Sequence, residues 1–343
     1  MKRYGHLFEK FISEENLDLA ERRARKGKAN RPEVQNFLRC REDNVRALRA
    51  SILNGTYRTS PYHNFPIYEP KERIISRLPY YPDRIVHHAL LNILEEIWVS
   101  QFTADTYSCI KGRGIHACAE AVKHALRTDP KGTKYCLKLD IKKFYPSLDH
   151  AVLKLIIRRK LKDERFMNVL DELIDSVPSG MPIGNYPSAY FANLYLSPID
   201  HGIKEELHIK YYFRYADDMT LLASTKEELH SALAWIIEKL EALKLSVKEN
   251  WQIFPVDSRG IDFVGYVFRH GKTDLRKGIK LRMLRNADRL AKRGASEAEA
   301  KAAMSGHWGW LKHCDNENLV VLINKKLGYD NIFERKASEP SAA

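Results

Sequence analysis

The sequence lacks the features that mark membrane and secreted proteins. In its 343 residues, no uninterrupted apolar stretch is long enough to span a bilayer. The first residues, MKRYGHLFEKF, carry no apolar signal-peptide core. Cysteine is scarce: five are scattered along the chain and none forms a C-x-x-C pair, so a disulfide framework and a zinc site are both unexpected. These absences predict a cytoplasmic protein with reduced thiols.

The chain carries an excess of positive charge. Lys and Arg together number 57 against 44 Asp and Glu, which gives a formal charge of +13 and a sequence pI of about 9.3. Such an excess favours a polyanionic partner, nucleic acid first and an anionic membrane second. Hydrophobic residues make up 44% of the sequence, enough for a sizeable core and too many for a disordered chain.

Residues 211–224, YYFRYADDMTLLAS, place two adjacent acids between two apolar runs. Two strand-like runs joined by a short acidic turn predict a β-hairpin with Asp217 and Asp218 at its tip. Carboxylates between segments that favour burial are costly unless they bind a metal or pair with a base. An ordinary solvated turn is an equally good interpretation of this segment alone, because Asp is common in turns.

A third acid stands at the end of another apolar segment. Residues 135–141, YCLKLDI, predict a strand that ends on Asp140, and Ser147 is expected to cap a helix running to about Lys162. An acid at a strand end is held by a rigid element and can serve as a metal ligand. A salt bridge at the strand end is the ordinary alternative.

Three loops combine flexibility with positive charge or free backbone groups. Lys71 and Arg73 lie in one of them and could present two cations to a phosphate. Lys111 and Arg113 belong to a short K-G-R-G loop, where glycine permits close approach to a ligand. The Gly- and Pro-rich segment SGMPIGNYP leads into a helix that Ser188 is expected to cap, which leaves backbone N–H groups free at the helix start.

Other elements follow from hydrophobic spacing and capping residues. Pro82 is expected to open a helix in its first turn. Thr225 and Glu228 fit a capping box at the start of another helix. Strands are expected at 245–256 and 260–268.

Two segments are strongly basic. Residues 21–31, ERRARKGKANR, fit a solvated helix face or a phosphate contact equally well. Residues 272–293 contain nine basic residues and two acids. The arginines that share one face of the helix expected there are Arg282, Arg285, Arg289 and Arg293. A one-sided arginine stripe favours a nucleic-acid clamp over a random solvated face.

The three acids suggest one chemistry if the fold brings them together. Two Mg²⁺ ions held about 4 Å apart by shared carboxylates can activate a 3′-hydroxyl and stabilise a leaving pyrophosphate. Mg²⁺ prefers few protein carboxylates together with substrate phosphate oxygens.

Together these motifs resemble those of a reverse transcriptase. Residues 215–218, YADD, resemble the Y-x-D-D motif, and Asp140 with Phe144 and Tyr145 resembles the strand-end catalytic Asp and the aromatic that follows it. The resemblance implies an α+β, right-hand polymerase fold with fingers, a palm containing a four-stranded antiparallel sheet, and a helical thumb. The implied domains are a helical N-terminal extension (1–56), fingers (57–134), palm (135–270, with a fingers insertion at about 150–180), helical thumb (271–333) and a disordered tail (334–343).

The resemblance also implies roles for individual residues. Asp140, Asp217 and Asp218 would be catalytic, with Asp218 the less direct ligand, and together with Ile141 they would bind two Mg²⁺ ions, for which Mn²⁺ can substitute. The implied nucleotide-binding residues are Lys71, Arg73, Phe144, Tyr145, Ile183 and Gly184, with Tyr145 as an aromatic wall that excludes a ribose 2′-OH. The implied primer grip is Phe263, Val264, Gly265 and Tyr266. The implied nucleic-acid contacts are Lys111, Arg113 and the four arginines of the stripe.

Within the family, the sequence most resembles bacterial reverse transcriptases of diversity-generating retroelements, which are error-prone at template adenine. The similar segments are KRYGHLFEKF, IYEPKERIISRL, IGN, GIDFVGY and Trp308-Gly309-Trp310. Ile183 stands where most reverse transcriptases have Gln, while Ala189 and Ala216 depart from the Gln and Met usual in the retroelement group. Antiphage-defence reverse transcriptases also lack the first Gln and are the alternative. Retrons and group II introns fit less well.

Two further classes stay open: a nucleic-acid-binding protein with a decayed polymerase fold, and a polymerase that makes RNA or needs no template. The expected partners are template RNA, its cDNA duplex and dNTPs, with either a small basic accessory protein or a structured non-coding RNA. No membrane partner is expected.

Overall fold

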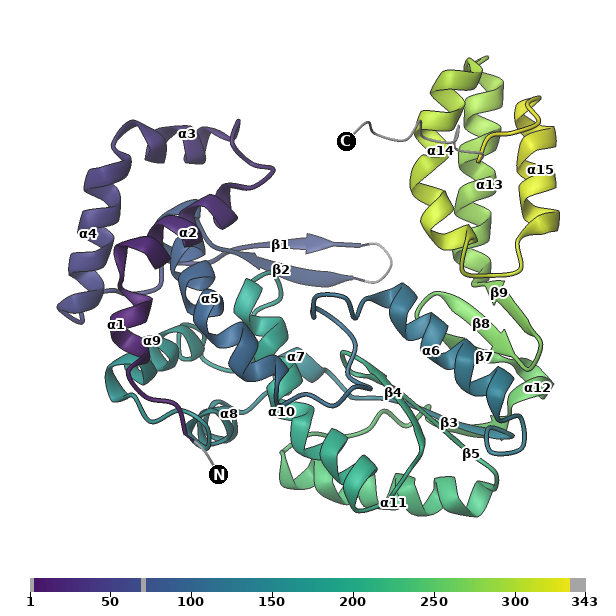
Figure 1. The fold of residues 1–343 in the computed structure, drawn as a ribbon, viewed down its shortest axis with the longest axis horizontal. Helices are drawn as coiled ribbons and strands as arrows, with labels where there is room; N and C mark the ends of the chain where they lie inside the picture. The colour runs from purple at the N-terminus through teal and green to yellow at the C-terminus, as the bar shows by residue number, and fades with distance from the viewer. Residues whose placement is uncertain (1–2, 69–71, 334–343) are drawn as a thin grey trace, which may run out of the picture.

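The computed structural model describes residues 3–68 and 72–333. Lys71 and the tail from residue 334 therefore lie outside the described residues. The N-terminal part is helical, as expected, and lies at the far end of the molecule from the last three helices (Figure 1). Its helices are α1 (Leu7–Phe11), α2 (Glu14–Arg25), α3 (Pro32–Arg39) and α4 (Arg41–Leu53).

A two-stranded antiparallel hairpin and two helices follow. They are β1 (His63–Ile67), β2 (Arg73–Arg77), α5 (Ile85–Val99) and α6 (Ile115–Thr128). A π-helical segment, η1 (Tyr80–Arg84), runs directly into α5, and the helical backbone that continues into α5 begins at Pro82, as expected. Tyr81 within η1 is extended, at φ −115° and ψ 133°. The residue before a proline is pushed out of the helical region, so Tyr81 forms the kink and Pro82 opens the helix.

A four-stranded antiparallel sheet forms the centre of the molecule. Its strands are β3 (Tyr135–Asp140), β4 (Tyr211–Tyr215), β5 (Asp218–Ala223) and β6 (Gln252–Pro255), in the order β4-β5-β3-β6. β4 and β5 form the expected hairpin. β3 and β5 pair so that Asp140 lies opposite Asp218. The sheet confirms the expected α+β, right-hand fold.

Both faces of this sheet are covered, which explains its apolar strands. Alternate residues of a strand point to opposite faces. Leu137 and Leu221 join the core that α5, α10 and α11 complete. Cys136 and Leu222 join the core that α6 and the last three helices complete. The helices between the strands are α7 (Phe144–Ser147), α8 (His150–Arg158), α9 (Glu164–Ile174), α10 (Tyr186–Glu205) and α11 (Lys226–Ala242).

Two expected helix caps are wrong. Ser147 is the last residue of α7, and Asp149 caps α8 by accepting a hydrogen bond from the backbone N–H of Val152. Ser188 is buried inside α10, which begins at Tyr186. Thr225 does cap α11, accepting a hydrogen bond from the backbone N–H of Glu228.

The two strands expected after α11 are shorter than predicted. The first is reduced to β6, and the second is broken into β7 (Ile261–Phe263) and β8 (Tyr266–Arg269), after the short helix α12 (Val256–Arg259). The break is a chain reversal at Val264 and Gly265, whose φ angles are 44° and 92°. β9 (Lys272–Leu275) completes a three-stranded antiparallel sheet.

Three helices form the thumb. They are α13 (Lys277–Lys292), α14 (Glu297–Leu311) and α15 (Glu317–Leu327), and they stand together above the three-stranded sheet (Figure 1). Ser296 and Glu299 make a capping box at the start of α14. Within residues 3–68 and 72–333, no helix is long and apolar enough to cross a membrane.

Candidate active site

Three carboxylates meet at one edge of the central sheet. The β4–β5 hairpin closes on the pair Tyr215 and Asp218, so Ala216 and Asp217 form a two-residue turn. Ala216 has a positive φ of 56°, which few residues with a side chain adopt. Asp140 lies directly across from Asp218 on the neighbouring strand β3. The fold thus brings together acids 77 positions apart in the sequence, as expected.

The surroundings of Asp217 disfavour its charged form. Burial, together with the neighbouring Asp140 carboxyl, raises the pKa of Asp217 to about 6. One oxygen of Asp140 pairs with the Lys248 ammonium. The other, Oδ1, is buried and finds no hydrogen-bond partner among the described residues. A buried acceptor without a donor, beside a carboxyl that resists ionisation, is the environment that a divalent cation would complete.

Asp218 is turned toward a different partner. The Lys138 ammonium lies 2.5 Å from its Oδ1. Burial raises the pKa of Asp218, while Lys138 opposes that rise. In the described part of the chain, no three His, Cys, Asp or Glu side chains are arranged as a closed metal cage. The donor set therefore fits a cation held by few carboxylates and completed by substrate oxygens, which is what Mg²⁺ prefers.

The two lysines at these acids were not singled out by the sequence. Lys138 lies two residues before Asp140 on β3, hence on the same face of the sheet, and its position inside an apolar strand was the available signal. Lys248 donates its backbone N–H to the carbonyl of Asp140 at 2.9 Å as well as pairing with the side chain. No local sequence pattern marks Lys248, since only the fold brings it to the site.

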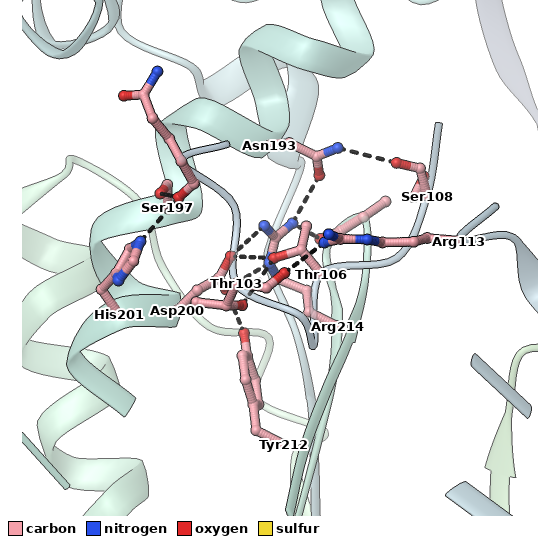
Figure 2. A network of polar contacts seen from close by, with 12 residues as sticks. Thr103, Thr106, Ser108, Arg113, Asn193, Ser197, Asp200, His201, Tyr212 and Arg214 are labelled. Atoms are coloured by element: carbon pink, nitrogen blue, oxygen red, sulfur yellow. Dashed lines mark hydrogen bonds and ion pairs between the residues drawn. The ribbon is translucent and has the colours of Figure 1, made fainter. Parts of the chain in front are cut away.

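A buried polar network lies beneath the hairpin and was also missed (Figure 2). Arg214 of β4 is fully buried and makes two contacts with the Asp200 carboxylate of α10, at 2.7 and 2.5 Å. The Tyr212 hydroxyl donates to Asp200 at 2.7 Å, and the Thr106 hydroxyl donates to it at 2.9 Å. The buried charges are thus paired and hydrogen-bonded, as their desolvation requires.

The same network reaches the turn that carries the acids. Arg214 Nη1 donates to the carbonyl of Ala216 at 3.0 Å and to Oδ1 of Asn193 at 3.0 Å. The Asn193 amide in turn donates to the carbonyl of Ser108 at 3.0 Å. Helix α10 and the loop before α6 are therefore connected through Asn193 and Arg214 (Figure 2). The hydrogen bond from Arg214 to Ala216 extends this connection to the backbone beside Asp217.

The two aromatic candidates after β3 differ in exposure. Phe144 is buried in the core and touches Tyr145 edge-on, with ring centroids 5.5 Å apart. Tyr145 is half-buried, and burial with the nearby Cys109 and Asp217 raises its pKa to about 12. Arg73 is close enough for its charge to act on the same hydroxyl. Tyr145 is thus a neutral phenol beside the acids, with Phe144 behind it.

The Ile183-Gly184 segment docks on the β1–β2 hairpin. The backbone N–H of Ser76 donates to the carbonyl of Ile183 at 2.8 Å. Gly184 has a φ of 124°, and a Cβ there would lie 2.7 Å from the carbonyl oxygen of Ser76. Glycine is required by this contact, which fixes the loop near Arg73 of β2.

The expected primer-grip residues form the β7–β8 turn. Phe263 and Tyr266 are buried, and Val264 is half-buried. A Cβ on Gly265 would lie 2.4 Å from the Trp310 side chain, so this turn packs tightly against the thumb. The Lys138 ammonium sits 4.7 Å from the centroid of the Phe263 ring. Lys138 therefore joins this turn to Asp218.

The remaining basic candidates lie farther out. Lys111 is exposed, while Arg113 is half-buried and donates to the carbonyl of Thr103 at 2.8 Å. On α13 and at its C-terminal end, Arg282, Arg285, Arg289 and Arg293 are all exposed. The opposite face of that helix buries Met283, Ala287 and Leu290. The stripe is one-sided, as the spacing predicts.

Comparisons with known proteins agree with this geometry. Residues 69–268 match the profile of the family described as "Reverse transcriptase (RNA-dependent DNA polymerase)". The chain is 28% identical over 176 residues to Protein YkfC of Escherichia coli K12, covering 47% of this chain and 45% of that protein. It is 23% identical over 215 residues to the group II intron-encoded protein LtrA of Lactococcus lactis, covering 59% of this chain and 35% of that protein. The chain thus spans less than half the length of these relatives.

Solved structures of telomerase share the fold. The Candida albicans enzyme in complex with the TWJ fragment of telomeric RNA aligns with a TM-score of 0.51 at 13% identity, covering 79% of this chain and 54% of that one. Apo telomerase from Candida tropicalis aligns with a TM-score of 0.50 at 10% identity, covering 78% and 62%. At such low identity the likeness concerns the fold alone. With the family profile matching more than half of its residues, the chain belongs to the reverse transcriptase family.

Proposed function

We propose that this chain is an RNA-directed DNA polymerase, which makes cDNA by nucleotidyl transfer. The observation that carries the proposal is the carboxyl pair of Asp140, at the end of β3, and Asp217, in the β4–β5 turn, with the unpartnered buried oxygen of Asp140. Burial and a neighbouring carboxyl disfavour the charged form of Asp217, and a cation bound between the two carboxyls would favour it. Because the pair lies in a reverse transcriptase fold, the bound cation would serve nucleotidyl transfer.

Asp140 and Asp217 would bind the metal, with the backbone carbonyl of Ile141 beside them. Asp218 would be a less direct ligand. Mg²⁺ bound there, or Mn²⁺ in its place, would activate the primer 3′-hydroxyl and stabilise the leaving pyrophosphate. Lys138 and Lys248 keep the carboxylates oriented before the metal arrives, because each donates to one of them.

The surrounding residues would bind substrates. Arg73, together with Lys71, would neutralise the incoming triphosphate. Tyr145, backed by Phe144, would press against the sugar and exclude a 2′-OH, while Ile183 and Gly184 would contact the base pair being formed. The β7–β8 turn, Phe263 to Tyr266, would hold the primer end. Lys111, Arg113 and the arginine stripe of α13 would contact the backbone of the template–product duplex.

Within this activity, we propose a reverse transcriptase of the diversity-generating retroelement type, cytoplasmic and error-prone at template adenine. Ile183 carries this assignment, since a branched apolar side chain cannot make the hydrogen bonds of the usual Gln. Replacing Ile183 by Gln is expected to reduce misincorporation opposite adenine; an unchanged error spectrum would remove Ile183 from the argument. A variable-repeat gene and a small basic accessory gene beside the coding sequence would support this role. A structured non-coding RNA in a defence island would support the antiphage alternative.

Primer extension on an RNA template with dNTPs and Mg²⁺ tests the activity. Asp217→Asn is expected to lower nucleotide incorporation by on the order of 100-fold or more, because a bound metal contributes several kcal/mol to the transition state. Asp218→Asn should lower it by less. Asp43→Asn, an exposed acid paired with Arg46 on α4, is the matched control and should leave the rate unchanged. Full incorporation by Asp217→Asn would reject the metal role.

A further inference from the structure

A histidine of α6 connects this helix to the thumb. His116 lies in the first turn of α6, and its ring stacks on the ring of His313, just after α14, with centroids 4.5 Å apart and planes at 14°. It also meets the Trp310 ring of α14 edge-on, with centroids 5.4 Å apart. Two aromatic contacts therefore hold the His116 ring against the end of α14.

A hydrogen bond also connects His116 to the expected primer grip. Its Nδ1 lies 3.0 Å from the hydroxyl oxygen of Tyr266 on β8. That hydroxyl donates to the backbone carbonyl of Trp310 at 3.1 Å. Because a hydroxyl has one hydrogen to donate, its oxygen accepts from His116, so Nδ1 of His116 carries a hydrogen. The Tyr266 hydroxyl thus joins α6, β8 and the thumb at one point.

The His116 ring is uncharged at neutral pH. Burial lowers its pKa, and the charges of His313 and Lys312 lower it further, while the charge of Glu120 opposes them. The Glu120 carboxylate accepts a hydrogen bond from Nδ1 of His313 at 2.8 Å. The Lys123 ammonium donates to Glu120 at 3.1 Å and to the carbonyl of His313 at 3.3 Å. Helix α6 thus fixes the residue on which the His116 ring stacks.

The β7–β8 turn extends this connection toward the carboxylates. Gly265 in the turn has a φ of 92°, and a Cβ there would lie 2.4 Å from the Trp310 side chain, so the thumb packs directly on the turn. At the start of the turn, the Phe263 ring lies 4.7 Å from the Lys138 ammonium, which pairs with Asp218 at 2.5 Å. A displacement of the turn would therefore be felt beside the proposed metal site.

The position of this turn matters more for the reaction than for the fold. Reacting atoms must be held about 3–3.5 Å apart, and a misplacement of about 1 Å can remove much of the rate. A turn that holds a primer end must therefore be fixed from both sides. Trp310 supplies the contact from the thumb, and His116 supplies the contact from α6.

We propose that His116 is a positioning residue for the primer terminus. Its Nδ1–H fixes the Tyr266 hydroxyl and thereby sets the position of the β7–β8 turn between α6 and the thumb. His116 acts through Tyr266 and not on the reacting atoms, so it is not a catalytic residue. The proposal rests on the proposed polymerase function for the identity of the strand that the turn holds.

Two substitutions separate the hydrogen bond from the ring. His116→Phe keeps a ring that can stack on His313 but removes the donor. His116→Asn removes the ring but places an amide N–H where Nδ1 was. His124→Phe makes the first change at an exposed position on the same helix and is the control.

The first measurement is single-turnover extension of a primer on an RNA template over a series of dNTP concentrations. His116→Phe should lower the maximal rate by about 3- to 10-fold, the range that one hydrogen bond supplies. The dNTP concentration that gives half of this rate should stay unchanged, because the triphosphate would bind at Arg73. His116→Asn and the control should stay within about 2-fold of the wild-type rate.

Thermal unfolding should rank the variants in the opposite order. His116→Asn loses the stacked ring and should unfold at a lower temperature than His116→Phe, although its rate is higher. A role in the fold alone would instead make the rates follow the unfolding temperatures. That result would overturn the proposal.

The second measurement needs no catalysis. The fluorescent base 2-aminopurine, which emits more strongly when it is unstacked, is placed at the primer terminus, and the complex is formed without dNTPs. His116→Phe should give a brighter complex than the wild type, while His116→Asn and His124→Phe should match the wild type. The dissociation constant of the duplex, from fluorescence anisotropy, should be the same for all four proteins.

Equal emission from the wild type and His116→Phe would overturn the positioning role. The two measurements also separate this proposal from the polymerase proposal. If the wild type incorporated no nucleotide while His116→Phe still changed the emission, the polymerase proposal alone would fail.

Discussion

Arg214 and Asp200 form a bidentate ion pair from which water is fully excluded, with both side chains at 0% exposure. A buried pair adds little stability compared with apolar residues of the same size, because desolvation offsets the attraction. The contribution of this ion pair is to hold the β4–β5 turn in position. Arg214 also donates a hydrogen bond to the carbonyl of Ala216, the residue before Asp217. Asp200 of α10 therefore fixes the backbone of the turn through Arg214.

Removing one partner of this ion pair should lower the stability of the fold strongly. Asp200→Asn leaves the Arg214 charge buried without a counterion and is expected to lower the free energy of unfolding by about 3–5 kcal/mol. Chemical denaturation measures the loss. Glu238→Gln, which breaks the exposed pair with Lys239, should cost less than about 1 kcal/mol. Similar losses for the two variants would contradict the assignment.

The paired replacement separates stability from positioning. Arg214→Met combined with Asp200→Leu removes both charges and should recover part of the stability lost by Asp200→Asn, although the buried Tyr212 hydroxyl then lacks its acceptor. It still lacks the donor to Ala216, so nucleotide incorporation should stay below wild type. Recovery of both stability and incorporation would show that Arg214 does not position the turn.

Much of the central sheet could be predicted from the sequence. Apolar runs around Asp217 and before Asp140 each specify a local strand, and the paired acids indicate a shared edge. The first residues of helices were harder to predict, because a cap depends on the path of the preceding chain. Ser147 and Asp149 are both suitable cap residues. Ser147 is the last residue of the short helix α7, so Asp149 caps α8 instead.

The polar partners could not be predicted. Lys138 and Lys248 reach their carboxylates across 80 and 108 residues of sequence, and no spacing rule covers such distances. The chain reversal at Val264 could not be predicted from the sequence for another reason. Valine favours extended backbone, so its positive φ is imposed by the turn and by packing against the thumb rather than by local preference.

The pKa of Asp217 predicts how stability varies with pH in the absence of metal. Its value of about 6 exceeds the ordinary 3.8, so the folded state binds a proton that the unfolded state releases between those values. The contribution is complete below about pH 4 and is lost as the pH rises through about 6. The free energy of unfolding of the wild type should fall over this window by at most about 3 kcal/mol relative to Asp217→Asn.

Mg²⁺ should reverse that trend, because it competes with the proton on Asp217. Its affinity, measured by titration calorimetry on the protein alone, should rise as the pH passes through about 6. Asp217→Asn should bind Mg²⁺ weakly at every pH in this range. An affinity of the wild type that is independent of pH would reject Asp217 as a ligand of the metal.

Gly184 tests the contact between the loop and the β1–β2 hairpin. Gly184→Ala places a Cβ 2.7 Å from the carbonyl oxygen of Ser76 at a φ of 124°, and should destabilise the fold by about 1–3 kcal/mol. The KM for dNTP should rise, because the loop beside Arg73 shifts. Gly278→Ala is the control: its Cβ meets open space on α13, and alanine there should stabilise by up to about 1 kcal/mol. Equal effects of the two substitutions would exclude a special role for Gly184.

Tyr145 tests which sugar the site accepts. Removing the ring by Tyr145→Ala opens space beside the nucleotide, so incorporation of ribonucleotides relative to deoxynucleotides should rise by at least about 10-fold. Single-turnover extension with each nucleotide measures the ratio. Tyr145→Phe keeps the ring and should keep the selectivity, because the hydroxyl, with its pKa raised to about 12, stays protonated and has no acid–base role at neutral pH. A wild type that already prefers ribonucleotides would contradict the assignment, since the proposed contact between the Tyr145 ring and the sugar would leave no room for a 2′-OH.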